Sequence, residues 1–333
     1  MLLFQLVAFA LYYDVISAWW NIQIFPLSQL SCSDKSDNLT VVTAFFNIGT
    51  FCCKRLGPHW LRTPNHYYKW AEGYGRVQAP VILYTDDSKF GTLFQEARKG
   101  LPTIIHYVDR SNLGSFRLIP RMRDLLSHLD GDMLHPHLHN PTYCAVMHAK
   151  YELMDWALTE DPFGTQYFLW LDAGVTRYGY PYSNVDYALQ VPNELKSSDQ
   201  NLVVYSEVYP FKSSLSVQSI FETDAVWVSG AGFLAAKQVM KQHVRLYNKT
   251  VHYLLDRGYF STDQLVLYAA YSREGKSHLE PSTKIVAYNK DSLTLVPTPT
   301  YSKYVFLLYL LLKPTFSLEN HDGYCPMEEG KSY

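Results

Sequence analysis

The carboxylate of Asp172 is expected at the end of a strand, where α/β proteins commonly place functional residues. Asp172 ends the apolar run Gln166–Leu171, and two small residues, Ala173 and Gly174, follow it. An apolar strand buries its own side chains, so the first acidic residue after it projects at the strand tip, where small neighbours let a phosphate approach. Such a carboxylate can coordinate Mg²⁺ or Mn²⁺ bridging a diphosphate. The simpler alternative is an aspartate that caps a turn, the commonest role of Asp-x-Gly.

A second acidic pair follows another apolar run. Asp86 and Asp87 come directly after Pro80–Thr85. Ligands of open α/β sheets bind at the carboxyl ends of the strands, so Asp86 and Asp172 are expected at the same edge. If they faced each other across roughly 5–10 Å, they would suit a hydrolase that works with paired carboxylates. The sequence therefore keeps such a hydrolase among the alternatives.

Other chemistry-bearing residues form weaker patterns. His135, His137 and His139 alternate, which on a strand would turn three imidazoles to one side for a metal, but Pro136 favours a loop. The five cysteines show no zinc-binding spacing, and their odd number leaves at least one without an intrachain partner. The sequence has neither a Gly-x-Ser-x-Gly elbow nor a phosphate-binding Gly-x-x-x-x-Gly-Lys loop.

The elements that position the two acidic sites are predicted from hydrophobic patterning. Apolar and β-branched runs bounded by turn signals predict strands at 39–46, 80–85, 102–108, 166–171, 201–205, 225–228 and 284–286. Periodic segments predict helices at 67–72, 90–100, 142–159, 233–247 and 262–271. Strand, helix and strand at this spacing form the βαβ units of a parallel sheet. The order becomes less regular after Asp172, so we expect one α/β domain with a more mixed C-terminal half.

Composition sets the class of protein and its partners. The chain has 333 residues, 47% hydrophobic and 18% charged, which suits a large core. The net charge is −2 and no run of five like charges occurs. A protein that tracks a phosphate backbone normally carries a basic stripe, so nucleic acid is not an expected partner.

The N-terminus indicates a secretory-pathway location. Residues 1–13 are apolar apart from Gln5, and small residues follow, so we interpret 1–18 as a signal peptide or signal-anchor. The run is shorter than the about 20 residues that a membrane-spanning helix needs; a buried helix is the alternative. A polar linker at 19–38 and a single domain at 39–330 complete the predicted organisation. Sequons at Asn38 and Asn248 favour a glycoprotein of the ER or Golgi lumen, or a secreted one, with membrane contact limited to the anchor.

Short blocks spread over residues 40 to 325 resemble a known family. The strand and acidic turn Phe168–Gly174 is similar to the Asp-x-Asp motif of GT-A glycosyltransferases. The chain more specifically resembles the HtrL/YibB/WlaTC family in the blocks Thr40–Phe46, Val81–Asp86, His148–Leu153, Phe168–Arg177, Ser229–Phe233 and Ser261–Gln264. The resemblance implies a GT-A-like domain with a mixed, mainly parallel central sheet. It also implies an enzyme that moves a sugar from a nucleotide-diphosphate donor to a glycan or lipid-linked acceptor.

The resemblance assigns donor-binding roles within this chain. Thr43, Ala44 and Phe45 are expected to hold the base and ribose, and Asp86 to face the nucleoside. Lys150, on the helix before the acidic motif, is expected to meet the diphosphate.

The same resemblance assigns residues to the reacting end of the donor. Gly230 and Gly232 belong to a loop of small residues where donor sugar and acceptor meet. Asp263 and Gln264 are expected near the reacting carbon. Asp172 approaches the metal or the donor sugar, and His321 contacts the diphosphate and the metal.

One departure from the GT-A motif affects the metal. A full Asp-x-Asp motif would place a second carboxylate at position 174, where this chain has Gly174. Two arrangements follow: Asp172 and His321 hold Mn²⁺ or Mg²⁺, or no metal binds and Lys150 and Arg177 neutralise the phosphates. Gly174 also supports the alternative function, a catalytically inactive GT-A-like protein that binds sugar or acts as a scaffold.

Overall fold

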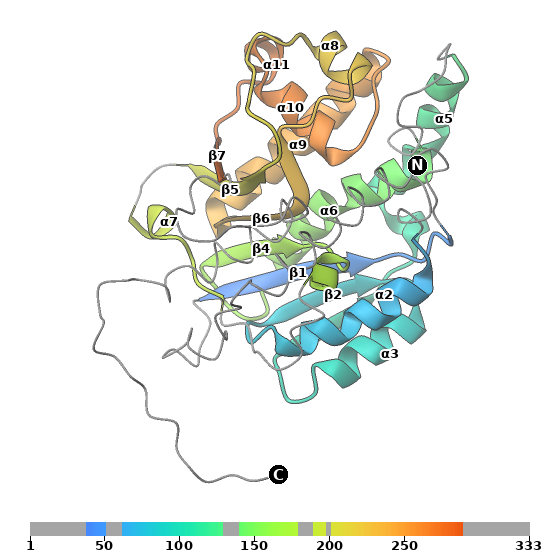
Figure 1. Cartoon of the computed structure of the whole chain (residues 1–333), viewed down its shortest axis with the longest axis vertical. Helices are drawn as coiled ribbons and strands as arrows, with labels where there is room; N and C mark the ends of the chain where they lie inside the picture. The colour runs from blue at the N-terminus through green and yellow to red at the C-terminus, as the bar shows by residue number, and fades with distance from the viewer. Residues whose placement is uncertain (1–37, 51–61, 129–139, 179–188, 198–200, 289–333) are drawn as a thin grey trace, which may run out of the picture. The chain divides into compact units, whose positions relative to one another are not determined.

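A central mixed sheet organises the residues that the computed structural model describes, which are 38–50, 62–128, 140–178, 189–197 and 201–288 (Figure 1). These residues belong to the compact unit Lys35–Pro314. Their sheet has seven strands in the order β3-β2-β1-β4-β6-β5-β7. In chain order the strands are β1 Leu39–Phe45, β2 Val81–Thr85, β3 Thr103–Tyr107, β4 Tyr167–Leu171, β5 Leu202–Glu207, β6 Val228–Ala236 and β7 Lys284–Tyr288.

The sheet is mostly parallel, as the strand and helix spacing predicts. β1 pairs in parallel with β2 and β4, β2 with β3, and β5 with β7. β6 runs antiparallel to both β4 and β5. β2 and β4 are buried along their whole length, which explains why their sequences are continuous apolar runs and do not alternate with polar residues.

Helices cover both faces of the sheet (Figure 1). Side chains alternate between the two faces of a strand. Tyr84 of β2 contacts Trp156 of α6 on one face, and Phe45 of β1 stacks on Phe90 of α3 on the other. The α-helices are α2 Pro64–Ala71, α3 Ser88–Ala97, α4 Gly114–Arg117, α5 Ile119–Ser127, α6 Pro141–Glu160, α7 Asn193–Ser197, α8 Val217–Glu222, α9 Lys237–Asp256, α10 Asp263–Tyr271 and α11 Arg273–Leu279. Short 3-10 turns lie at Glu72–Arg76, Arg110–Asn112 and Val175–Tyr178.

The C-terminal half differs from the sequence-based expectation at β6. The strand predicted at 225–228 is wrong except for its last residue, because β6 occupies Val228–Ala236, and the helix predicted at 233–247 is confirmed only from Lys237, where α9 begins. The expected loop of small residues around Gly230 and Gly232 is also wrong, since both glycines lie within β6. Antiparallel pairing with β4 explains the difference: Gly232 lies opposite Leu171 and Phe233 opposite Trp170, so ladder hydrogen bonds outweigh the local helical pattern.

Several sequence-based expectations fall outside the described residues. They are the signal or anchor at 1–18, almost all of the linker at 19–38, the histidines His135, His137 and His139, and His321. The domain limits and the secretory location therefore stay predictions. Within the described ranges, no helix is both long and apolar enough to cross a membrane.

Two histidines lie inside the core between α6, α9 and the sheet. His148 Nδ1 lies 2.7 Å from the Tyr247 hydroxyl, and His243 Nε2 lies 2.7 Å from the Tyr205 hydroxyl. Burial lowers the pKa of each histidine to about 3, and the Lys150 charge adds to the effect at His148. Both imidazoles are therefore neutral in the folded chain at neutral pH.

We predict that stability falls as the pH drops below about 6.5. Between pH 6.5 and 3 the unfolded chain takes up protons on these histidines and the folded chain does not, so folding loses up to about 1.4 kcal/mol per pH unit for each. Urea unfolding of wild type and His243→Gln from pH 7 to 5 measures this. The variant should show a shallower pH dependence, whereas His278→Gln, at an exposed position, should match wild type. Equal slopes in all three proteins contradict the prediction.

Candidate functional site

A buried lysine lies at the carboxyl end of β4. Lys150 comes from the middle of α6, and its side chain is 3% exposed. Its Nζ donates to the Gly230 carbonyl at 2.8 Å and to Asp263 Oδ2 at 3.0 Å. It also lies 3.0 Å from Asp172 Oδ1 and 3.3 Å from Asp172 Oδ2. An ammonium has three N–H donors, so all three have acceptors within the protein. We call Lys150, Asp172 and Asp263 the carboxylate–lysine triad.

The charges of the triad are strongly coupled. Burial lowers the pKa of Lys150, but the negative charges of Asp172 and Asp263 outweigh it, and the pKa lies above its ordinary value. Burial has the larger effect at Asp263 and holds the pKa of its carboxyl above the ordinary value, although the Lys150 ammonium opposes that rise. Lys150 is therefore charged at neutral pH.

Asp172 is the triad member that reaches solvent, with 32% of its side chain exposed. Its backbone is fixed by a hydrogen bond from its N–H to the Ala231 carbonyl at 2.9 Å. Tyr74 adds a hydroxyl that lies 3.0 Å from the Asp172 carbonyl. Trp170 Nε1 donates to Asp172 Oδ1 at 2.8 Å. The carboxylate therefore stands at the strand tip, as the sequence predicts, and is held from several sides.

Asp263 is buried beneath β6. It is the first residue of α10, and its carboxylate lies so close to Gly230 that a Cβ at that position would overlap it. Gln264 is partly exposed and donates through Nε2 to the Val228 carbonyl at 3.1 Å. The structure thus brings together four of the residues predicted from sequence, Lys150, Asp172, Gly230 and Asp263. The buried position of Asp263 suits support of Asp172 better than direct contact with an acceptor.

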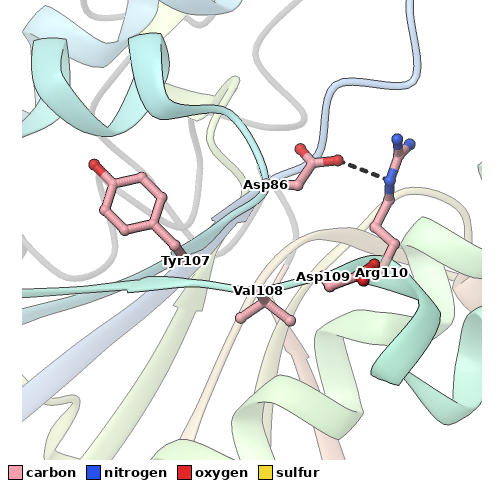
Figure 2. Close-up of a pocket in the computed structure, with 5 residues that line it drawn as sticks. All are labelled: Asp86, Tyr107, Val108, Asp109 and Arg110. Atoms are coloured by element: carbon pink, nitrogen blue, oxygen red, sulfur yellow. Dashed lines mark ion pairs between the residues drawn. The ribbon is translucent and has the colours of Figure 1, made fainter.

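A pocket of about 430 Å³ lies at the carboxyl ends of β2 and β3, lined by Asp86, Tyr107, Val108, Asp109 and Arg110 (Figure 2). Arg110 Nε lies 2.7 Å from Asp86 Oδ2, and Asn47 N donates to Asp86 Oδ1 at 2.8 Å. Tyr107 is 60% exposed. The sequence predicts Asp86 but misses Tyr107 and Arg110. Their position directly at the end of the third apolar run is the signal that could have found them.

The pocket and the triad lie at the same edge of the sheet. β2 and β4 flank β1, so their tips are two strand spacings apart, about 10 Å. Asp86 is bound by Arg110 and Asn47, and Asp172 by Lys150 and Trp170. This separation is at the upper limit of the roughly 5–10 Å that suits paired carboxylates, and each carboxylate has its own partners, so the hydrolase alternative stays a prediction.

The predicted base and ribose contacts on β1 are largely covered. Thr43 is fully buried, and its hydroxyl lies 3.0 Å from that of Tyr74. Phe45 is also buried and stacks on Phe90 with a centroid separation of 4.3 Å. Ala44 is partly exposed. Of these three, Ala44 is the residue whose side chain a ligand could touch in this conformation.

The described residues do not by themselves make a site for Mn²⁺ or Mg²⁺. Such a cation needs several oxygen ligands. Asp172 offers one carboxylate, already bound by Lys150 and Trp170, and position 174 is glycine. No group of three metal-ligating side chains occurs in the described part of the chain. His321 lies outside it, so the metal stays a prediction.

The comparisons with known proteins give a family without an activity. A family described as "Bacterial protein of unknown function (HtrL_YibB)" matches residues 37–279, which is more than half of the chain and includes every member of the triad. No curated protein matches the chain in sequence.

We predict that Gly230→Ala destabilises the protein, because the new methyl group overlaps the Asp263 carboxylate and displaces it from Lys150. Overpacking of this kind costs about 1–3 kcal/mol, measured as a lower urea midpoint. Gly114→Ala is the matched control, since the nearest atom to its added Cβ is Glu152 Oε1 at an ordinary 3.5 Å. Equal stability of the two variants contradicts the prediction.

Proposed function

The chain belongs to the HtrL_YibB family, and we propose that it is a GT-A-like glycosyltransferase using a nucleotide-diphosphate sugar. The observation that carries the proposal is the triad, which presents the Asp172 carboxylate at the carboxyl edge of a mostly parallel sheet. Ligands of open α/β sheets bind at this edge. The acceptor proposed is a glycan or a lipid-linked sugar, whose hydroxyl attacks the donor.

The pocket on the other side of β1 supports a place for the nucleoside. Tyr107 offers an exposed ring on which a base can stack, and Asp86 offers carboxylate oxygens that accept from ribose hydroxyls. Arg110 adds a guanidinium suited to a phosphate oxygen. A donor whose base lies here would extend along the strand tips, past β1, toward Asp172. The separation of about two strands accommodates an extended ligand.

The proposed chemistry needs few dedicated groups. The acceptor oxygen bonds to the anomeric carbon while the bond from that carbon to the diphosphate oxygen breaks, and the electron pair leaves with the diphosphate. With inversion, Asp172 takes the acceptor proton as general base. With retention, the acceptor proton goes to the leaving diphosphate oxygen on the same face of the sugar, and Asp172 holds hydroxyls of the donor sugar. Positioning of donor and acceptor supplies most of the rate in either case.

One observation favours the second candidate, a sugar-binding protein without activity. Gly174 stands where a second carboxylate would complete the Asp-x-Asp motif, and Asp172 is already paired with Lys150. Such a protein would bind a donor or a glycan and not turn it over. A screen of nucleotide-sugar donors for turnover and for thermal stabilisation separates the two functions.

We predict that the purified full chain transfers or hydrolyses sugar from one member of a panel of UDP- and GDP-sugars, assayed with and without Mn²⁺. Asp172→Asn should lower kcat by about 10²-fold to 10⁴-fold, the range of a general base. Asp256→Asn, at a carboxylate that is 69% exposed on α9, should keep wild-type turnover. Thermal stabilisation by a donor without turnover favours the binding protein. If no donor gives turnover and no donor gives thermal stabilisation, both functions are contradicted.

We predict that Tyr107→Ala weakens binding of the matching nucleoside diphosphate by about 5-fold to 150-fold, because base stacking on an aromatic ring contributes about 1–3 kcal/mol. Titration calorimetry measures the dissociation constant. Tyr209→Ala removes a comparably exposed ring, 57% exposed, from beyond β5 and should leave affinity unchanged. Equal losses in the two variants would place the nucleoside elsewhere.

A further inference from the structure

The ammonium of Lys150 has no N–H donor left for a ligand. Its three acceptors are the Gly230 carbonyl, Asp263 and Asp172, at 2.8 to 3.3 Å. A phosphate could reach Lys150 only by displacing one of them, and two of the three are carboxylates paired with a buried charge. Breaking such a pair leaves an uncompensated buried charge, which is strongly unfavourable. The arrangement is therefore built to hold Lys150 in place.

We infer that Lys150 and Asp263 are positioning residues that fix the direction of the Asp172 carboxylate, and that the ligand group meeting Asp172 is a hydroxyl donor and not a phosphate. That the hydroxyl belongs to a sugar rests on the proposed function. The positioning role of Lys150 and Asp263 does not depend on any activity.

The contacts of Asp172 distinguish its two oxygens. Oδ1 accepts from Trp170 Nε1 at 2.8 Å and lies 3.0 Å from Lys150 Nζ. Oδ2 accepts a hydrogen bond from Lys150 Nζ at 3.3 Å, which occupies one of its two lone-pair sites. A carboxylate offers about four lone-pair sites, so Oδ2 keeps acceptor capacity for a ligand. Because 32% of the Asp172 side chain is exposed, a ligand can reach it.

Asp263 fixes the position of the Lys150 ammonium through a buried ion pair. Its side chain is 3% exposed and is packed against Gly230, whose carbonyl accepts from the same ammonium. The missing side chain at Gly230 makes this approach possible. Asp263 therefore acts on Asp172 through Lys150.

Charge decides which ligand group fits. Asp172 is the exposed member of the triad, and its carboxylate oxygens only accept hydrogen bonds, so they repel a phosphate oxygen and attract a hydroxyl proton. Sugars present several hydroxyl donors. The sugar end of a donor or acceptor therefore suits Asp172, and the diphosphate is expected to lie away from the triad.

The indole N–H of Trp170 reports the position of Asp172 without any activity. The full chain is labelled with ¹⁵N-tryptophan, and the Trp170 indole resonance is identified by its loss in Trp170→Phe. Asp263→Asn keeps a hydrogen-bond acceptor but removes the charge that holds Lys150, so this resonance should shift. Asp256→Asn, on the exposed surface, should leave it in place. An unmoved Trp170 resonance in Asp263→Asn overturns the positioning role.

Melting temperatures test the pairing of Lys150 with Asp263 even in variants too unstable for the resonance experiment. Lys150→Met leaves Asp263 buried without its cation, so its melting temperature should fall. Adding Asp263→Asn to Lys150→Met removes that charge and should raise the melting temperature again, although Asp263→Asn alone lowers it. Melting temperatures that fall further in the double variant overturn the pairing.

Inorganic pyrophosphate tests the ligand class. Added to the labelled wild type, it should leave the Trp170 indole resonance in place, since the phosphate is kept from the triad. A shift at Trp170 that saturates overturns the second part of the inference. Where the donor screen finds turnover, Asp263→Asn should lower kcat with little change in KM, as expected of a residue that orients the reacting carboxylate.

Discussion

The burial of one lysine ammonium between two carboxylates is the constraint on which the site depends. Lys150 is 3% exposed, and a charge so far from water is tolerated only when it is paired and fully hydrogen-bonded. Asp172, Asp263 and the Gly230 carbonyl meet that requirement. Since they come from the end of β4, the start of α10 and β6, the pairing ties three elements to α6 at one point.

The strand order brings the triad to the edge where ligands bind. The reversal at β6 lets its backbone run beside the tip of β4, and the Asp172 N–H to Ala231 carbonyl hydrogen bond joins them. On the other side of β1, Arg110 forms an ion pair with Asp86, as Lys150 does with Asp172. The two acidic residues that follow apolar strands are thus each held by a cation from a different element.

This arrangement gives a physical meaning to the glycine at position 174. A second carboxylate there would add negative charge beside Asp172, which then would call for a cation from outside the protein. In this chain the compensating cation is built in as Lys150, with its N–H donors satisfied. The proposed transferase would therefore rely on an oriented carboxylate and on groups away from the triad to handle the diphosphate.

The sequence by itself determined the elements whose patterns are local. The apolar runs gave β1, β2 and β4 and placed Asp86 and Asp172 at their tips, and periodicity gave α6 with Lys150 in it. Its limit is visible at β6, where Phe233 continues a strand although the local pattern favours a helix. Pairing with β4, which lies far away in sequence, decided that segment.

Only the tertiary structure decided what Lys150 binds. Its partners lie 22, 80 and 113 residues away along the chain, and Arg110 approaches Asp86 across 24 positions (110 − 86). A pattern of residue types shows that charges exist near strand ends. It cannot show which charges form a buried ion pair, because that depends on how elements distant in the sequence pack and on which charged groups are desolvated at the same site.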